Sequence, residues 1–386
     1  MRFSPGVTEI LILLFFAIPI LFAVRMFWLC WTRGREPEQG SITVQYDPPD
    51  NLTPGECAAL VENKIAMSTI TATIVDLSVK GYLAIKQEQV SSQAAAANAG
   101  KSFVFHLLRE QDDWNTLKPH EKAVLTGIFV RMNPLEILSE AMSKLQNAAP
   151  DSPVAPMYAR VQDRIAATES MIAANPGLSA VTDRQFGPKN EVALLELHNQ
   201  FYMHLQRIRD AVFDSIVASG YYDKRPDRVR LAYGVSGVAT GLLMAAGGVV
   251  LAAATRTPPW PWVLAGILTG TIILVAGRMM TPRTVAGTQA LARVMGFRDF
   301  IARVDKDQIA RVEKTPDLFE KYLPYAMALR VETKWSQAFG NLSMPAPRWY
   351  GSNLPGDFQT AHLVDDLTGM STQAETVLTS RSAATR

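Results

Sequence analysis

Three long apolar runs divide the chain, at about residues 8–31, 231–254 and 261–277. Each is close to the roughly 20 residues that a helix needs to cross a bilayer. The second and third runs hold no charged residue, and the short link "TRTPPW" joins them. Two neighbouring helices without a polar stripe have no side to turn toward water, so the pattern predicts a membrane hairpin at 231–280.

The first run predicts a membrane anchor at 1–32, rather than a cleaved signal peptide. Arg25 lies near the end of the run, where its long side chain reaches the interface beside Trp31. Glu9 and Pro19 interrupt the run, and "VRMFWLCW" stands where a signal peptide would have small residues for cleavage.

Glycines spaced by four occur in both helices of the predicted hairpin. Such spacing lets helix backbones approach closely in lipid. We therefore expect helix packing in the membrane at Gly237, Gly241, Gly266 and Gly270.

The basic residues near the ends of the runs predict the orientation. Cytoplasmic loops carry an excess of lysine and arginine. The tip of the hairpin has only Arg256, and the first run has Arg2 before it and Arg33 and Arg35 after it. The open end of the hairpin is flanked by Lys224, Arg225, Arg228, Arg230, Arg278, Arg283 and Arg293. We expect a multi-pass protein of the inner membrane with its N-terminus outside and its soluble regions and C-terminus in the cytoplasm.

Between the first two runs, residues 33–130 read as a soluble module. "NLTPGECAALV" begins a helix, with Thr53 as N-cap and Pro54 at the first helical position. A second helix follows in "STITATIVDLSVK" and ends at Gly81. "YLAIKQEQV" and "SFVFHLLRE" alternate as two strands. Two helices followed by a hairpin predict a winged-helix-like unit.

A winged helix raises the question of nucleic-acid binding, and the second helix argues against it. We expect Thr69, Thr73, Asp76 and Lys80 to share its exposed face. One lysine offset by one aspartate cannot neutralise several phosphates. We therefore expect protein partners of unknown identity, and no nucleic acid, at this module.

The remaining soluble segments are predicted from weaker patterns. Residues 131–230 read as a helical region, which includes an amphipathic helix over "EVALLELHNQFYMHLQRIRDAVFDSIVASGYY" that ends at a glycine-aromatic turn. Residues 281–350 read as further helices, with an amphipathic one over 284–313. Residues 351–386 have few core residues and are expected to be disordered. The fold class is thus a mainly α membrane protein, with three transmembrane helices, the winged-helix-like α+β module and a C-terminal helical segment.

Four motifs resemble those of a known family, in the same order along the chain. They are "WTRGREPEQGSITVQYDPPDNLTPGE", "TATIVDLSVKGYLAI", "GFRDFIARVDKDQI" and "FEKYLPYAMALRVETKWSQAF". They are similar to the cytoplasmic half of the predicted bacterial membrane proteins of domain-of-unknown-function family 2207. The resemblance covers most of residues 28–350 and implies a membrane-anchored cytoplasmic region with no established activity. Its members usually carry a β-rich extracytoplasmic domain before the first span, where this sequence has only "MRFSPGV".

Composition and candidate chemistry add little to this reading. The net charge of +2 gives no general attraction to acidic partners, and two cysteines make no disulfide framework. His198 and His204 are six residues apart and do not converge on one face of a helix. We find no phosphate loop, nucleophile elbow or Cys-x-x-Cys pair. We expect no catalytic residue, cofactor or metal site.

Contact surfaces are the remaining candidates for function. One is the stiff strip Tyr46, Asp47, Pro48 and Pro49, which either docks a partner or packs as an entry strand. The other is the aromatic set Phe319, Tyr322, Tyr325 and Trp335, which forms either a docking site or a core helix. In both cases packing is the favoured interpretation.

These features favour a non-enzymatic scaffold or signalling adaptor. The expected partners are the lipid bilayer and proteins, and a homo-oligomer stays open. A membrane-tethered nucleic-acid-binding regulator, or an enzyme with a site not visible in the sequence, is the alternative.

Overall fold

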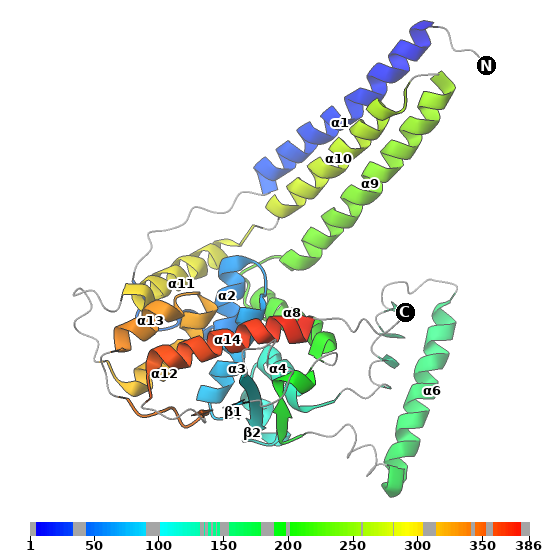
Figure 1. Cartoon of the computed structure of the whole chain (residues 1–386). Coiled ribbons are helices and arrows are strands. Elements are labelled where there is room, and N and C mark those ends of the chain that lie inside the picture. Colours follow the sequence, from blue (N-terminus) through cyan, green and yellow to red (C-terminus); the bar gives the residue numbers. More distant parts are fainter. Residues whose placement is uncertain are drawn as a thin grey trace. The chain divides into compact units, whose positions relative to one another are not determined.

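A computed structural model gives the arrangement of the chain (Figure 1). It describes residues 5–33, 44–89, 101–131, parts of 135–146, 154–178, 189–197, 201–255, 258–280, 282–303, 314–340, 344–352 and 358–379. The chain forms two compact units, and both are assembled from separate segments. Unit 1 comprises Met1–Leu52, Glu56–Lys64 and Phe213–Phe300, and unit 2 comprises Thr53–Gly55, Ile65–Val212 and Ile301–Arg386. Arg2, Arg35 and Arg256 lie outside the described residues.

Unit 1 contains the apolar helices. They are α1 (Pro5–Arg33), α9 (Pro226–Thr255) and α10 (Trp260–Met279). α10 packs against both α1 and α9 (Figure 1). Among the described residues, α9 from Pro226 to Ala254 and the whole of α10 are long and apolar enough to cross a membrane. In α1 the same criterion finds a shorter apolar helix, Pro19–Thr32, so the first span stays a prediction.

Two further helices belong mainly to unit 1. α2 (Pro54–Glu62) begins at the proline that the sequence placed at the first helical position. α11 (Val285–Arg303) covers the first part of the amphipathic helix expected at 284–313, and residues 304–313 lie outside the description.

Unit 2 is built on a four-stranded sheet with the order β3-β2-β1-β4. β1 (Leu83–Gln89) and β2 (Lys101–Leu107) form the antiparallel hairpin that the sequence predicts, with Ile85 opposite Phe105. β3 (Glu191–Ala193) pairs antiparallel with β2, and β4 (Tyr350–Ser352) pairs parallel with β1. The helix expected to begin at Glu191 is therefore wrong at its start. Its first residues form β3, a 3-10 turn at Leu194–Leu197 follows, and the helix proper, α8, spans Phe201–Ala218.

The helix before the sheet is at the centre of unit 2. α3 (Met67–Val79) packs against α4 (Pro119–Phe129), α12 (Pro316–Ala328), α14 (Thr360–Thr379) and β1. The expected exposed face is wrong for three of its four residues, because Thr69, Thr73 and Asp76 are buried and only Lys80 is exposed. The order α2, α3, β1, β2 is as expected, whereas the winged-helix assignment stays a prediction.

The C-terminal segment is ordered where the structure describes it, so the disordered tail expected at 351–386 is wrong over Thr360–Thr379. α14 buries Leu363, Leu367 and Met370 on one face. These side chains repeat at i, i+4 and i+7, which is the pattern of an amphipathic helix against a core. α14 packs against α3 and α13 (Glu332–Phe339).

Helix ends follow the predicted glycine turns. α3 and α8 are each followed by a glycine in the left-handed region, Gly81 with φ 76° and Gly220 with φ 75°. The next residue, Tyr82 or Tyr221, then donates its amide to a carbonyl five residues earlier, at 2.9 and 3.2 Å. Both are Schellman-type ends, for which glycine is preferred because it has no Cβ. The expected helical region at 131–230 also contains α6 (Ala155–Ala174), which is largely exposed, and the residues around α6 are described only in part.

Candidate functional site

The predicted glycine pairs lie in the interface between α9 and α10. A methyl group on Gly266 would lie 2.6 Å from the carbonyl oxygen of Gly241, and one on Gly237 would lie 3.0 Å from that of Gly270. The first distance is too short for a side chain and the second is tighter than most side-chain contacts, so the two backbones are in close contact. Thr269, also buried here, donates its hydroxyl to Ala265 O at 2.8 Å, which satisfies it within its own helix.

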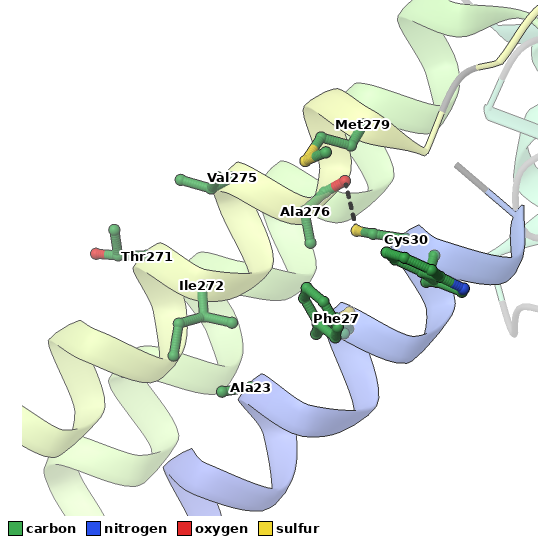
Figure 2. A pocket seen from close by; sticks show the side chains of 10 residues that line it. Ala23, Phe27, Cys30, Thr271, Ile272, Val275, Ala276 and Met279 are labelled. Atoms are coloured by element: carbon green, nitrogen blue, oxygen red, sulfur yellow. Dashed lines mark hydrogen bonds between the residues drawn. The ribbon is translucent and has the colours of Figure 1, made fainter. Parts of the chain in front are cut away.

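α1 and α10 form a second contact, and an open groove of about 550 Å³ runs beside it. Figure 2 shows Ala23, Phe27 and Cys30 of α1 near Ile272 and Ala276 of α10. The Cys30 thiol lies 4.0 Å from the main-chain oxygen of Ala276. The groove is completed by Met26, Trp31, Thr271, Val275 and Met279.

Three side chains donate hydrogen bonds to residues at the C-terminal end of α2. Arg283, which follows α10, is buried and donates Nη2 to the carbonyl oxygen of Leu60 at 2.7 Å. Arg230 on α9 donates to Asn63 O at 3.0 Å. The hydroxyl of Tyr222 donates to the side-chain oxygen of Asn63. A cation on the last carbonyls of a helix also matches the negative end of its dipole.

Other basic residues near the hairpin are also engaged within unit 1. Arg225 is buried and forms ion pairs with Asp214 and Asp227, at 3.0 and 2.7 Å. Arg293 of α11 lies 2.5 Å from Asp50. Lys224, Arg228 and Arg278 are exposed. The orientation predicted from the sequence gave all of these charges equal weight, although Arg225, Arg283 and Arg293 form contacts within unit 1.

Asp50 also binds the hydroxyl of Tyr221, at 3.0 Å. Burial raises the pKa of Tyr221 to about 12, and the hydrogen bond and the charge of Asp50 act in the same direction. The phenol is therefore protonated and acts as the donor at all physiological pH values.

The predicted strip at residues 46–49 is mixed in its exposure. Tyr46 is 54% exposed and its ring lies edge-on to that of Phe300, with the centroids 5.3 Å apart. Asp47 is exposed, Pro48 is half-buried and Pro49 is buried. Part of the strip therefore packs, and Tyr46 and Asp47 present a surface.

The aromatic set is wrong as a docking site for three of its four members. Phe319, Tyr322 and Trp335 are at most 3% exposed, and Tyr325 is half-buried. The ring of Trp335 packs against Phe339 at 4.8 Å between centroids, and its Nε1 donates to Phe319 O. These residues form the core between α12 and α13, which is the interpretation that the sequence favoured.

Unit 2 contains a charged cluster in which two buried carboxylates, Asp76 and Glu121, meet the partly exposed Lys80, and the sequence did not reveal the part of Glu121. Lys80 Nζ lies 2.7 Å from Asp76 Oδ2 and 2.6 Å from Glu121 Oε1. Burial raises the pKa of Asp76 to about 6, against the lowering effect of the Lys80 charge. Burial also acts to raise the pKa of Glu121, but Lys80 and the Lys118 amide hold it below its usual value. Next to the cluster, Thr53 Oγ1 lies 2.9 Å from His120 Nε2.

The histidines do not gather into a site within the described residues. Burial lowers the pKa of His204 to about 4, which keeps its ring neutral. His106 Nδ1 lies 3.6 Å from Glu191. His198 lies outside the described residues. In the part of the chain that the structure covers, no group of three or more His, Cys, Asp or Glu side chains could hold a metal ion.

Comparison with known proteins gives one result. The profile of the family described as "Predicted membrane protein (DUF2207) C-terminal domain" matches residues 43–175 and 179–339. No curated protein and no solved structure matches the chain. The match covers most of the chain and includes both candidate membrane helices, the end of α2 that they hold and the charged cluster. The chain therefore belongs to the DUF2207 family of predicted membrane proteins, through its C-terminal domain.

Proposed function

We propose that this chain is a non-enzymatic membrane scaffold or signalling adaptor, which presents a protein-interaction surface beside the bilayer. The observation that carries the proposal is the attachment of the end of α2 to α9 and to the segment that follows α10. Arg230, near the start of α9, donates to Asn63 O. Arg283, after the end of α10, donates to Leu60 O. Such an attachment holds the end of α2 at a fixed distance from the hairpin.

The proposed topology has three spans, with α1 beside the hairpin. Packing of α1 on α10 supports it, since a helix detached from the bilayer would expose the apolar face that includes Phe27 and Trp31. The exposed Lys224, Arg228 and Arg278 support a cytoplasmic location for the open end of the hairpin. The soluble regions then lie in the cytoplasm of a bacterial cell, and the first residues lie outside.

The proposed interaction surface is centred on Tyr46 and Asp47. An exposed aromatic ring beside a carboxylate, on a segment stiffened by two prolines, can bind with little loss of conformational entropy. The nucleic-acid alternative has less support, because the face of α3 that would enter a duplex is buried within unit 2.

Site-specific photo-crosslinking in intact cells tests this role. A photoreactive amino acid replaces Tyr46 in the full-length chain, and a control replaces Tyr202, which is 41% exposed in unit 2. We expect a discrete protein crosslink from position 46 that Asp47→Lys reduces, and no such crosslink from position 202. Equal crosslinking from both positions, or none from position 46, would contradict the adaptor role.

A further inference from the structure

The groove between α1 and α10 has walls of hydrocarbon. Its ten lining residues include one hydroxyl, on Thr271, and one thiol, on Cys30. The Thr271 hydroxyl donates to Ile267 O at 2.8 Å, and the Cys30 thiol is turned toward Ala276 O (Figure 2). Neither group is directed at an occupant of the groove. The indole N–H of Trp31 is the one further side-chain donor in the lining, and the rest of the walls is apolar, so their chemistry suits an alkyl chain.

Cations lie at one end of this groove. Met279 closes the lining at the C-terminal end of α10, and the exposed Arg278 is its neighbour in sequence. α9 begins at the same end of the antiparallel hairpin, and Lys224 and Arg228 are exposed there. Of the nearby carboxylates, Asp227 is paired with Arg225 and Asp223 is exposed. Asp214 is exposed and is also paired with Arg225, so the four cations Lys224, Arg225, Arg228 and Arg278 stand against the three carboxylates Asp214, Asp223 and Asp227 and leave a net charge of +1.

We propose that the groove binds an anionic phospholipid, with one acyl chain between α1 and α10 and the phosphate at Arg278. The charge distribution fits this lipid, because the acyl chain would lie along the apolar groove and the anionic phosphate would lie at the end of the groove, where Arg278 is exposed. A second copy of the chain fits less well, since two copies in one membrane would bring their Arg278 side chains to the same level. The inference rests on the proposed membrane position of α1.

The membrane position of α1 is tested first and separately. In a Cys30→Ala, Cys57→Ala background, Ile20→Cys places one thiol midway along α1. In vesicles we expect it to resist a charged maleimide and to react after solubilisation and denaturation. Rapid labelling in intact vesicles would show that α1 lies outside the bilayer, which would overturn the three-span proposal and the lipid site together.

Lipid binding is then measured by native mass spectrometry of the full-length protein. The protein is taken from vesicles of equal parts phosphatidylcholine and phosphatidylglycerol. An arginine near the surface contributes about 1 kcal/mol to attraction of an anionic lipid, so we expect about fivefold enrichment of phosphatidylglycerol. Arg278→Gln should reduce that enrichment, whereas Lys334→Gln, an exposed charge in unit 2, should leave it unchanged.

A variant that fills the groove tests the contribution of the acyl chain independently of the contribution of the charge. Val275→Trp places a large ring in the lining and should reduce the total lipid retained. Leu243→Trp, on an exposed position of α9, should retain as much lipid as the wild type. Equal retention in Val275→Trp and wild type would overturn the site, even if Ile20→Cys is protected. A dimer mass that Val275→Trp abolishes would instead assign the groove to a second copy.

Discussion

The guanidinium of Arg283 binds the carbonyl oxygen of Leu60 through two nitrogens, Nε at 3.1 Å and Nη2 at 2.7 Å. The two residues are far apart in the sequence. The bond joins the segment after α10 to the end of α2, and a weaker contact of Nη2 with Val61 O, at 3.4 Å, accompanies it. A residue that cannot donate to these main-chain oxygens would leave them without the bonds that Arg283 makes.

Arg283→Gln should therefore destabilise unit 1 by about 1–3 kcal/mol, since buried acceptors lose a charged donor. The apparent Tm of the full-length protein in detergent measures the effect. Lys64→Gln is the matched control, because the Lys64 side chain is 66% exposed and a surface substitution should change stability by about 0.5 kcal/mol or less. Equal Tm values for the two variants would show that the Leu60 contact contributes nothing.

Gly266→Ala should weaken the packing of α9 on α10. The added methyl group would lie 2.8 Å from the amide nitrogen of Ala245 as well as close to Gly241 O, so the helices must separate. We expect a loss of roughly 1–3 kcal/mol, typical of overpacking. Gly247→Ala is the control, because no atom lies within 4 Å of the position that its methyl group would take. Thermal unfolding followed by circular dichroism distinguishes the two, and a Gly266→Ala variant as stable as Gly247→Ala would refute close packing.

Asp76→Asn should change how stability depends on pH. A carboxyl group whose folded pKa is raised, here to about 6, holds its proton more tightly in the native state than in the unfolded one. Its contribution to stability is fully present below the unfolded pKa of 3.8 and is lost as the pH rises through about 6. The wild type should thus lose stability over this range relative to Asp76→Asn.

Unfolding midpoints between pH 4 and pH 7 measure this difference. Glu121 acts in the opposite sense, because its pKa is lowered and its stabilisation is lost as the pH falls. Asp76→Asn keeps the Glu121 side chain, so the difference between the two curves reports on Asp76 together with its interaction with Glu121. Asp365→Asn, at an exposed position of α14, is the control and should follow the wild type. Parallel curves for Asp76→Asn and wild type would contradict the raised pKa.

Leu367→Ala should destabilise unit 2 by about 2–5 kcal/mol, the range for a buried leucine. The side chain is fully buried on the face of α14 that packs in the core. Thr368→Ala, exposed on the next position, should have little effect. Limited proteolysis reports the result, since undocking of α14 exposes its backbone to cleavage. Equal protease resistance in both variants would indicate that α14 contributes little to the core.

The sequence predicted the features that depend on local patterns. The hairpin followed from two uncharged runs, and the ends of α3 and α8 followed from Gly81 and Gly220. It failed where distant segments decide burial. Thr69 and Asp76 look like exposed residues on their own helix, but α4, α12 and α14 cover α3, and two of these come from the far end of the chain.

The same limit applies to the C-terminus and to the contact residues. Leu363, Leu367 and Met370 have the spacing of an amphipathic helix, but the prediction of disorder relied on the low number of core residues in this segment. The aromatic set was predicted as a core or a docking site, and only its contact with Phe339 decides between them. The roles of Arg283 and Arg225 had no sequence signal apart from their charge.

Because β4 pairs with β1, the sheet cannot be completed until almost the whole chain has been synthesised. Ile85 is aligned with Tyr350, so the last strand of the sheet leaves the ribosome long after the first. Roughly 220 residues separate the end of α4 from β4, which at roughly 5–20 residues per second is about 10–45 s of translation. Both candidate membrane helices are synthesised during this interval. The surfaces of α3 and β1 that α12 and β4 cover in the finished protein therefore stay exposed during this interval, and this is when chaperones have access to them.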